Sequence, residues 1–376
     1  MKKEKSKSRL VYFGLKYYPS RGGVSRTTEH LIRQLKDNYD ITIYCYRHPQ
    51  AKDYLPGVRA IQLPKFGPGS IGVFPYFFLC CMHMLLFGKY DIVHLRKIDS
   101  SFFLPLIRLK FKKVLATSHE RTYLSTKWNA PARAFFKLNE KIFVRSPSTL
   151  TAISKSLCSY YEKEHGRKVI YTPNGVNQLS EYNEKGADEL LKQHGIGEGY
   201  LFFAARRIMA TKGLHLLLDA LQSIDYKGDV LVAGETNHDR EYMKEIERHP
   251  SFSRLKWIGY IADKSLLLAL AKHSRLFLFP SLSEGMSIML LETAGTGTPV
   301  VASDIVANTD IFNGEEVLFF RTEDAAHLKE KLQWALNHPD EMDAMADRAR
   351  IRSKTEYTGD SMTKQYKTLY DRLLES

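Results

Sequence analysis

The stretch at residues 281–304, SLSEGMSIMLLETAGTGTPVVASD, carries two carboxylates, Glu284 and Glu292, at either end of a predicted loop and helix. Apolar runs at 276–279 and 299–302 predict a buried strand on each side of it. Glu284 then lies where a helix begins, and a helix N-terminus exposes unpaired backbone N–H groups. Glu292 follows about 12 Å further along the axis, at 1.5 Å per residue. This spacing suits an elongated ligand with a hydroxylated group at the second carboxylate.

Apolar strands alternate with helical patterns through the whole chain. Continuous apolar strands between helices are typical of parallel sheets that are covered on both faces. The sequence therefore predicts an α/β protein with two Rossmann-like domains, whose ligands bind beyond the carboxyl ends of the strands. The predicted strands are 10–13, 41–46, 58–63, 92–95, 114–117, 149–153 and 169–171, then 201–205, 230–233, 257–258, 276–279, 300–302 and 317–320. Helices are predicted at 25–35, 214–222 and 266–272.

The polar, glycine-containing segment 178–199 predicts the linker between the two domains. The pattern from Asp340 onward predicts a continuous helix. We expect an N-terminal domain at 1–178, a C-terminal domain at 179–357, and a last helix at 358–376 that begins near Gly359-Asp360.

Charge is distributed unevenly along the chain. Residues 1–180 hold 31 lysines and arginines against 11 acidic residues, a net +20, whereas residues 181–376 are net −7. An anionic membrane surface or a phosphorylated lipid would suit the basic half. A solvated basic face is the alternative.

The only long apolar run, 71–87, is interrupted by Gly72 and Pro75 and is shorter than the about 20 residues of a membrane-spanning helix. It predicts a helix buried against a sheet, with phenylalanines such as Phe74, Phe77 or Phe78 reaching a membrane interface. The four cysteines show no metal-binding spacing, and the N-terminus shows no signal peptide. These features predict a cytoplasmic protein, with peripheral contact with the cytoplasmic face of the membrane.

Phosphate-binding groups are predicted after the first strand of each half. Gly22-Gly23 follows strand 10–13, and glycine there permits close approach of a phosphate to backbone N–H groups. Arg207 and Lys212 follow strand 201–205, where two cations and a helix N-terminus can clamp a diphosphate. His119 ends strand 114–117, although a lone histidine is more often structural than catalytic.

Other nucleotide-binding motifs are weak or absent. Residues 67–72, GPGSIG, match the GxGxxG pattern of dinucleotide-binding folds, but they follow the third predicted strand and no acidic residue ends the next. No DxD motif occurs, which weakens the case for a metal-dependent transferase. No nucleic-acid-binding module or basic-aromatic repeat occurs either.

Five motifs together resemble the retaining glycosyltransferases with the GT-B fold, glycosyltransferase family 4. They are, in order, PSRGGV at 19–24, VLATSH at 114–119, YTPNGV at 171–176, RIMATKG at 207–213, and the two glutamates eight positions apart. The resemblance implies two Rossmann-like domains with an interdomain cleft and a C-terminal crossover helix.

The resemblance also implies roles for individual residues. Gly22, Gly23, Arg207 and Lys212 would bind the donor diphosphate, and Glu292 the ribose hydroxyls. His119 and Glu284 would be catalytic, with Glu284 beside the sugar as either nucleophile or electrostatic stabiliser. Backbone donors at Gly285, Met286 and Ser287 would hold the donor sugar.

The implied reaction moves a sugar from a nucleoside diphosphate to an acceptor hydroxyl, with no metal and no cofactor. The segment from Lys127-Trp128 through Glu140 resembles the subgroup that builds bacterial surface polysaccharides, including rhamnosyltransferases. We therefore expect a glycan or lipid-linked acceptor, an anionic membrane surface as a peripheral partner, and no nucleic acid. Two alternatives stay open at this point: a sugar-nucleotide epimerase of the same architecture and a basic nucleic-acid-binding protein.

Overall fold

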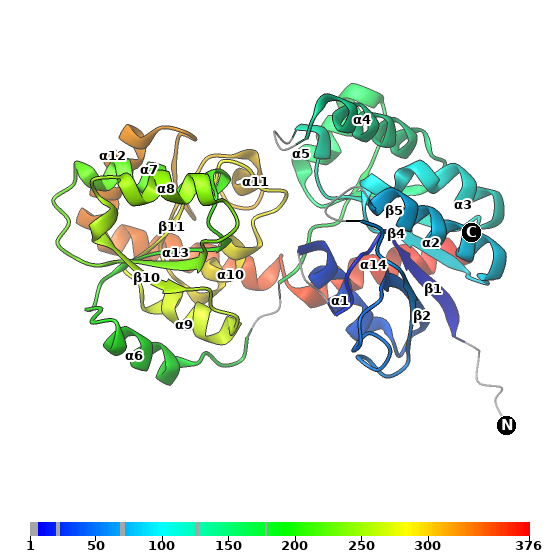
Figure 1. Cartoon of the computed structure of the whole chain (residues 1–376), viewed down its shortest axis with the longest axis horizontal. Helices are drawn as coiled ribbons and strands as arrows, with labels where there is room; N and C mark the ends of the chain where they lie inside the picture. The colour runs from blue at the N-terminus through cyan, green and yellow to red at the C-terminus, as the bar shows by residue number, and fades with distance from the viewer. Residues whose placement is uncertain (1–6, 20–22, 68–71, 125–127, 177–178) are drawn as a thin grey trace. The chain divides into compact units, whose positions relative to one another are not determined.

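The computed structural model describes residues 7–19, 23–67, 72–124, 128–176 and 179–376. The chain divides into two compact units. The first unit consists of Met1–Gly175 together with Gly359–Ser376, and the second unit is Val176–Thr358. Each unit has its own sheet and its own hydrophobic core. Figure 1 shows helices on both faces of each sheet.

The first unit contains a seven-stranded sheet in the order β3-β2-β1-β4-β5-β6-β7. All neighbouring strands are parallel, as predicted from their continuous apolar sequences. The strands are β1 (Ser8–Phe13), β2 (Tyr39–Tyr46), β3 (Val58–Leu63), β4 (Ile92–Leu95), β5 (Val114–Ser118), β6 (Thr149–Ala152) and β7 (Ile170–Tyr171).

Helices α1 and α14 cover one face of this sheet and bury its core, with Leu31 and Ile32 of α1 and Tyr366 and Tyr370 of α14 fully inaccessible. The helices are α1 (Gly23–Leu35), α2 (Val73–Phe87), α3 (Leu104–Lys110), α4 (Ala130–Arg145), α5 (Lys155–His165) and α14 (Gly359–Glu375). The last helix therefore belongs to the unit that begins the chain.

The second unit contains a six-stranded parallel sheet in the order β10-β9-β8-β11-β12-β13. Its strands are β8 (Leu201–Arg207), β9 (Val230–Glu235), β10 (Leu255–Gly259), β11 (Leu276–Phe279), β12 (Val300–Ser303) and β13 (Leu318–Phe320). Its helices are α6 (Glu184–Gln193), α7 (Leu214–Gln222), α8 (Arg240–Arg248), α9 (Lys264–His273), α10 (Ile288–Thr296), α11 (Val306–Thr309), α12 (Ala325–Asn337) and α13 (Pro339–Thr355).

One prediction about helices is wrong, and another holds in part. The segment 178–199, predicted to be a linker, contains α6, whose N-terminus is capped by the Asn183 side chain and whose Glu184 pairs with Lys272 of α9. The tail from Asp340 is helical as predicted but forms two helices: α13 ends at Thr355, and α14 begins at Gly359, near the predicted start of the last helix. Between them, Thr358 forms a β-bridge with Val176.

Helix α2 is the buried helix predicted from the apolar run. Its inward face consists of Tyr76, Phe77, Cys80, Cys81 and Met84. Phe77 is therefore not available to a membrane, whereas Phe74 and Phe78 are exposed. No helix in the described ranges is both long enough and apolar enough to cross a membrane.

Candidate active site

Both sheets reverse their strand order once, and the reversal marks where ligands bind in open α/β sheets. In the first unit it lies between β1 and β4, and in the second unit between β8 and β11. Chains leave these neighbouring strands in opposite directions, so a crevice opens at their carboxyl ends. Most of the predicted site residues follow one of these four strands.

In the second unit, Lys212 and Glu284 lie together at the reversal. The Lys212 Nζ atom donates to Glu284 Oε1 over 2.5 Å. Two contacts hold the loops after β8 and β11 against each other. The Leu282 N–H donates to the Thr211 carbonyl over 2.9 Å, and Gly213, at φ +72°, approaches Pro280 so closely that a Cβ atom would lie 2.0 Å from its carbonyl oxygen. Only glycine fits this position.

Arg207 lies at the same edge but not in this ion pair. Its Nε atom lies 3.8 Å from Glu235 Oε2 at the end of β9, and 45% of its side chain is exposed. Lys212 ends a single 3₁₀ turn, Ala210–Lys212, and α7 begins at Leu214, as predicted for the helix at 214–222. The two predicted cations therefore lie at different points. Arg207 is the last residue of β8, and Lys212 ends the 3₁₀ turn that follows it.

A buried hydroxyl network fixes the loop between β11 and α10. The Ser287 hydroxyl donates to Asn308 Oδ1, and the Ser303 hydroxyl donates to the Ser281 carbonyl, each over 2.5 Å. The Ser287 side chain thus holds the loop and does not cap α10. Met286 is buried and Gly285 is half-buried beside it. Backbone N–H groups of this segment remain the groups predicted to hold the donor sugar.

Glu292 lies on α10 and pairs with Lys264, the first residue of α9, over 2.5 Å. Its carboxylate is largely buried, with a side-chain exposure of 6%. The Lys264 ammonium pairs with one carboxylate oxygen, and a carboxylate can accept hydrogen bonds from two vicinal hydroxyls. Sequence reasoning missed Lys264, because this lysine is close to Glu292 only in the folded chain.

In the first unit, His119 directly follows β5 and is buried. Its ring hydrogen-bonds to the backbone of Arg96, and its Nε2 atom has no hydrogen-bond partner among the described residues. Burial, together with the positive charges of Arg96 and Lys97, holds the pKa of His119 well below its ordinary value. The imidazole is therefore neutral, with one nitrogen available to a ligand.

Arg96 is a second residue that sequence reasoning missed. It directly follows β4 and is fully buried, yet it forms no ion pair with any carboxylate in the described part of the chain. Its Nε atom donates to Thr28 Oγ1 over 2.9 Å and its Nη2 atom to Thr27 Oγ1 over 3.3 Å, while Nη1 has no partner. Its position after an apolar strand is the same signal that identified His119.

Of the predicted diglycine loop, Gly22 lies outside the described residues. Gly23 begins α1, and a Cβ atom added to it would meet nothing within 4 Å. The threonines that bind Arg96 lie in the first turns of the same helix. Among the residues that the structure describes, no group of three or more His, Cys, Asp or Glu side chains could hold a metal ion.

Comparison with known families matches nearly the whole chain to glycosyltransferases. The family described as Glycosyltransferase Family 4 matches residues 21–178, and the family described as Glycosyl transferases group 1 matches residues 187–352. The chain belongs to the group 1 glycosyltransferases.

Individual group 1 relatives are similar over different lengths. The D-rhamnosyltransferase WbpZ of Pseudomonas aeruginosa is 31% identical over 42% of this chain and 41% of its own. The UDP-Gal:alpha-D-GlcNAc-diphosphoundecaprenol alpha-1,3-galactosyltransferase of Escherichia coli is 25% identical over 84% of each chain. These relatives support a glycosyltransferase activity for this chain.

A solved structure shares the fold of this chain. The sucrose-phosphate synthase from Thermosynechococcus elongatus superimposes with a TM-score of 0.80 over 98% of this chain and 100% of its own, at 18% identity. The fold is thus the predicted GT-B type, α/β with two parallel sheets.

Proposed function

We propose that this glycosyltransferase moves a sugar from a nucleoside diphosphate to an acceptor hydroxyl with retention of anomeric configuration. One observation carries the proposal: the reversal of the second sheet gathers a lysine, a fixed loop with backbone donors, and a buried carboxylate in the second turn of α10. These groups match, in order, a diphosphate, a sugar and a ribose.

The donor diphosphate would compete with Glu284 for Lys212. Lys212 forms an ion pair with this carboxylate, so an incoming phosphate must share or replace that partner. Arg207 is more exposed and lies farther from its carboxylate, at 3.8 Å, so it is the freer of the two cations. Charge-assisted hydrogen bonds from both would offset the charge of the leaving group.

In the transfer step, the bond between the sugar C1 and the donor phosphate oxygen breaks, and the phosphate keeps the electron pair. The acceptor oxygen forms the new bond to C1 on the same face, and its proton passes to the departing phosphate. His119, neutral and with Nε2 unpartnered, is assigned to contact with the transferred sugar. Glu284 is assigned to the positive charge that develops on the sugar ring.

We propose a lipid-linked glycan as the acceptor, in the synthesis of a bacterial surface polysaccharide. One relative supports a lipid-linked acceptor by name, a galactosyltransferase that acts on a diphosphoundecaprenol-linked sugar. The net +20 charge of residues 1–180 suits an anionic membrane surface. The enzyme would then act in the cytoplasm, at the inner face of the membrane.

A donor screen followed by mass spectrometry tests the reaction. Incubation with nucleoside-diphosphate sugars and lipid-linked acceptors should give an acceptor heavier by one sugar residue. Isomerised donor without transfer would instead indicate an epimerase. NMR of the product linkage then decides between retention and inversion.

The binding site is tested separately by titrating nucleoside diphosphate into Lys212→Ala. Loss of one charge-assisted phosphate contact costs about 1.5–3 kcal/mol, so affinity should fall at least about tenfold. Lys244→Ala, which removes an exposed lysine from α8, is the matched control and should bind normally. Equal affinity of the two variants would remove Lys212 from the donor site.

A further inference from the structure

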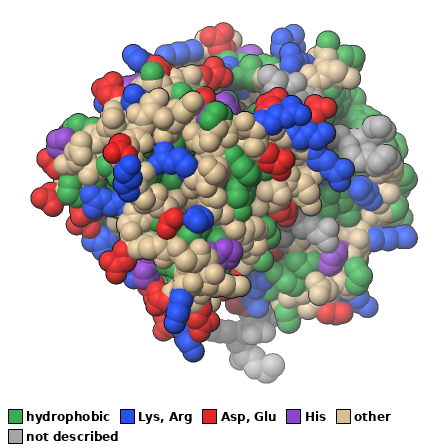
Figure 2. Space-filling model, turned by 60° about the vertical axis from the view of Figure 1, so that its left-hand side comes forward, with side chains coloured by type: hydrophobic (Ala, Val, Ile, Leu, Met, Phe, Trp, Pro, Cys, Tyr) green, Lys and Arg blue, Asp and Glu red, His purple; other side chains and the backbone are tan. Residues whose placement is uncertain are grey.

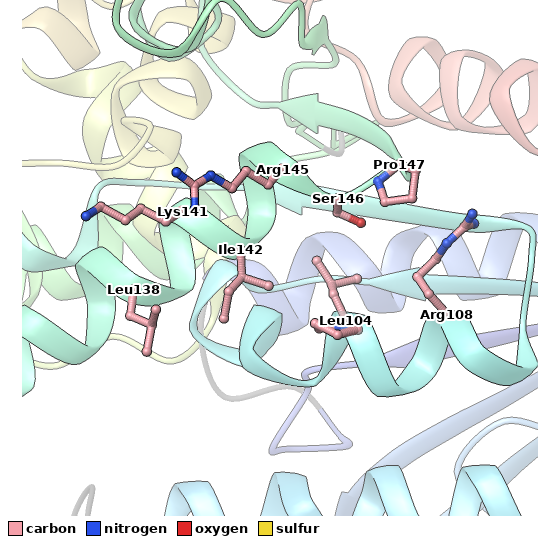
Figure 3. Close-up of a pocket in the computed structure, with 9 residues that line it drawn as sticks. Leu104, Arg108, Leu138, Lys141, Ile142, Arg145, Ser146 and Pro147 are labelled. Atoms are coloured by element: carbon pink, nitrogen blue, oxygen red, sulfur yellow. The ribbon is translucent and has the colours of Figure 1, made fainter.

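A pocket with a volume of about 290 Å³ lies between α3 and α4 of the first unit, apart from the proposed catalytic residue of that unit. Leu104 of α3 and Ile142 of α4 form apolar walls, and Leu138 lies at its edge (Figure 3). His119 is at the carboxyl end of β5, whereas this pocket extends to Ser146 and Pro147, which precede the amino end of β6. Parallel strands place these ends at opposite edges of the sheet.

Three cations line this apolar pocket. Figure 3 shows Arg108 extending from α3 on one side, and Lys141 and Arg145 from α4 on the other. Arg108 donates to the Lys112 carbonyl, and none of the three forms an ion pair with a carboxylate within the described ranges. Lys141 and Arg145 are exposed. An anion at the pocket would therefore meet positive charge that no carboxylate neutralises.

Large apolar side chains are exposed on the helices around this pocket. Leu109 of α3 is 76% exposed, and Leu86 and Phe87 at the end of α2 are 66% and 71% exposed. Helix α2 packs against α3, and α3 against α4, so these side chains belong to one region of the first unit. Exposed apolar residues among unpaired cations are the composition of a surface that inserts into an anionic membrane interface. On the face that Figure 2 brings forward, by contrast, acidic and basic side chains lie interspersed.

We propose that the pocket between α3 and α4 binds one anionic phospholipid of a membrane. The lipid phosphate would contact Arg108, Lys141 and Arg145, and the beginning of an acyl chain would lie against Leu104 and Ile142. The lining favours this occupant over a soluble anion. A free phosphate would contact the cations but would leave the apolar walls of the pocket without an apolar partner. The proposal rests on the peripheral membrane contact of the proposed function and adds a defined site to it.

Sedimentation with vesicles tests this site in the full-length chain, without donor or acceptor. One set of vesicles contains phosphatidylcholine alone, and the other has part of it replaced by phosphatidylglycerol. We expect binding only to the second set, and a loss of roughly tenfold or more in the triple variant Arg108→Gln, Lys141→Gln, Arg145→Gln. The control variant Arg47→Gln, Lys52→Gln, Arg59→Gln removes the same charge from exposed positions on and beside β2 and β3 and should bind nearly as well as the wild type.

The variant Ile142→Phe separates lipid capture from simple adsorption. It narrows the pocket and adds apolar surface, so binding should weaken if a lipid enters and stay equal or strengthen if the surface only adsorbs. Thermal unfolding midpoints confirm that each variant is folded. Equal losses in the two triple variants, or unchanged binding in Ile142→Phe, would overturn the pocket while leaving the membrane contact intact. If the wild-type chain does not bind anionic vesicles, both the lipid pocket and the membrane contact are overturned. That result would leave the proposed transfer reaction standing, because the reaction is tested separately with a soluble acceptor analogue.

Discussion

Arg96 shows how a single side chain can set the chemistry of its neighbour. Its guanidinium is fully buried, with two threonine hydroxyls and the Tyr366 ring, 5.2 Å away, as its neighbours. Burying an unpaired charge costs several kcal/mol of folding free energy, so a role for the Arg96 charge in the site is expected to offset that cost. One effect of that charge is to disfavour protonation of His119.

Replacement of Arg96 by methionine should therefore raise the pKa of His119. Burial is the larger cause of the lowered pKa and stays in place, and Lys97 still opposes protonation, so the rise should be partial. His94, whose pKa Arg96 also lowers, should move in the same direction. Titration of the histidine ring resonances by NMR measures both. A His119 that titrates as in the wild type would show that Arg96 only supports the fold.

Glu292→Gln should weaken donors with an intact ribose more than donors that lack one ribose hydroxyl. The amide keeps the size of the side chain but loses the charge and one acceptor oxygen, and it leaves Lys264 without its partner. Calorimetric titration of the two donor types into both proteins gives the comparison. Equal losses for both donors would place Glu292 outside the ribose site.

Transfer should persist in EDTA, because Arg207 and Lys212 are proposed to offset the charge of the leaving diphosphate. The assay compares initial rates with and without the chelator, using a donor that the screen has identified. A complete loss of activity that magnesium or manganese restores would contradict the role given to these side chains.

At the scale of elements, the sequence predicts the strands and three of the helices closely, but it misses helix α6 and the break before α14. All predicted strands occur within two residues of their predicted bounds. The central strands β1, β4, β5, β8 and β11 are largely buried on both faces, so their sequences are continuous apolar runs. Helix α6 escaped prediction because it buries only Ala187 and looks like a polar linker. The 3₁₀ turn at Ala210–Lys212 is followed by Gly213, which approaches Pro280, a contact between distant segments that the sequence alone does not reveal.

The candidate site likewise contains residues that local sequence patterns reveal and contacts that only the folded chain reveals. Residues at the ends of apolar strands, such as Arg207 and His119, can be found from the sequence, because parallel strands collect their carboxyl ends at one edge. The ion pairs Glu284–Lys212 and Glu292–Lys264 cannot be found from the sequence, since each pair joins residues from different loops or helices. Arg96 also directly follows an apolar strand, but the neighbouring sequence does not reveal that its side chain is fully buried.

Helix α14 is anchored to the first sheet by buried hydroxyl groups, which gives a prediction at this scale. The Tyr370 hydroxyl lies 2.6 Å from His94 Nδ1 and donates to the Tyr12 hydroxyl over 3.2 Å. Tyr370→Phe leaves the buried His94 nitrogen without this partner, so the free energy of unfolding should fall by about 1–3 kcal/mol.

Chemical unfolding measures that change. Tyr260→Phe is the matched control, because Tyr260 is 47% exposed, and it should leave stability nearly unchanged. A Tyr370→Phe chain as stable as this control would mean that the Tyr370 hydroxyl does not help to hold α14 in place.

At the scale of the whole molecule, the first unit should be sensitive to mild acid. His94 and His119 are buried in it, and both have pKa values well below the ordinary value of about 6.5. The unfolded chain takes up these protons at higher pH than the folded chain does. Stability from the two neutral rings is therefore fully present above about pH 6.5 and falls as pH decreases below it, by up to about 1.4 kcal/mol per pH unit for each ring.

Hydrogen exchange at successive pH values should show protection falling in β4, β5 and α14 as the medium becomes more acidic, after correction for the intrinsic exchange rate. His119→Gln should make the decline shallower, whereas His238→Gln, at an exposed position, should not. Declines of the same steepness in all three proteins would contradict the assignment.

The return of the chain to its first unit has a consequence for biosynthesis. Gly359–Ser376 completes that unit, but the ribosome makes it only after the entire second unit. Domains that are contiguous in sequence can fold in order as they emerge. The face of the first sheet that α14 covers therefore stays exposed until α14 has been synthesised, so the second unit can fold before the first is complete. A nascent chain stalled before Gly359 would therefore be a better client for chaperones than the finished protein.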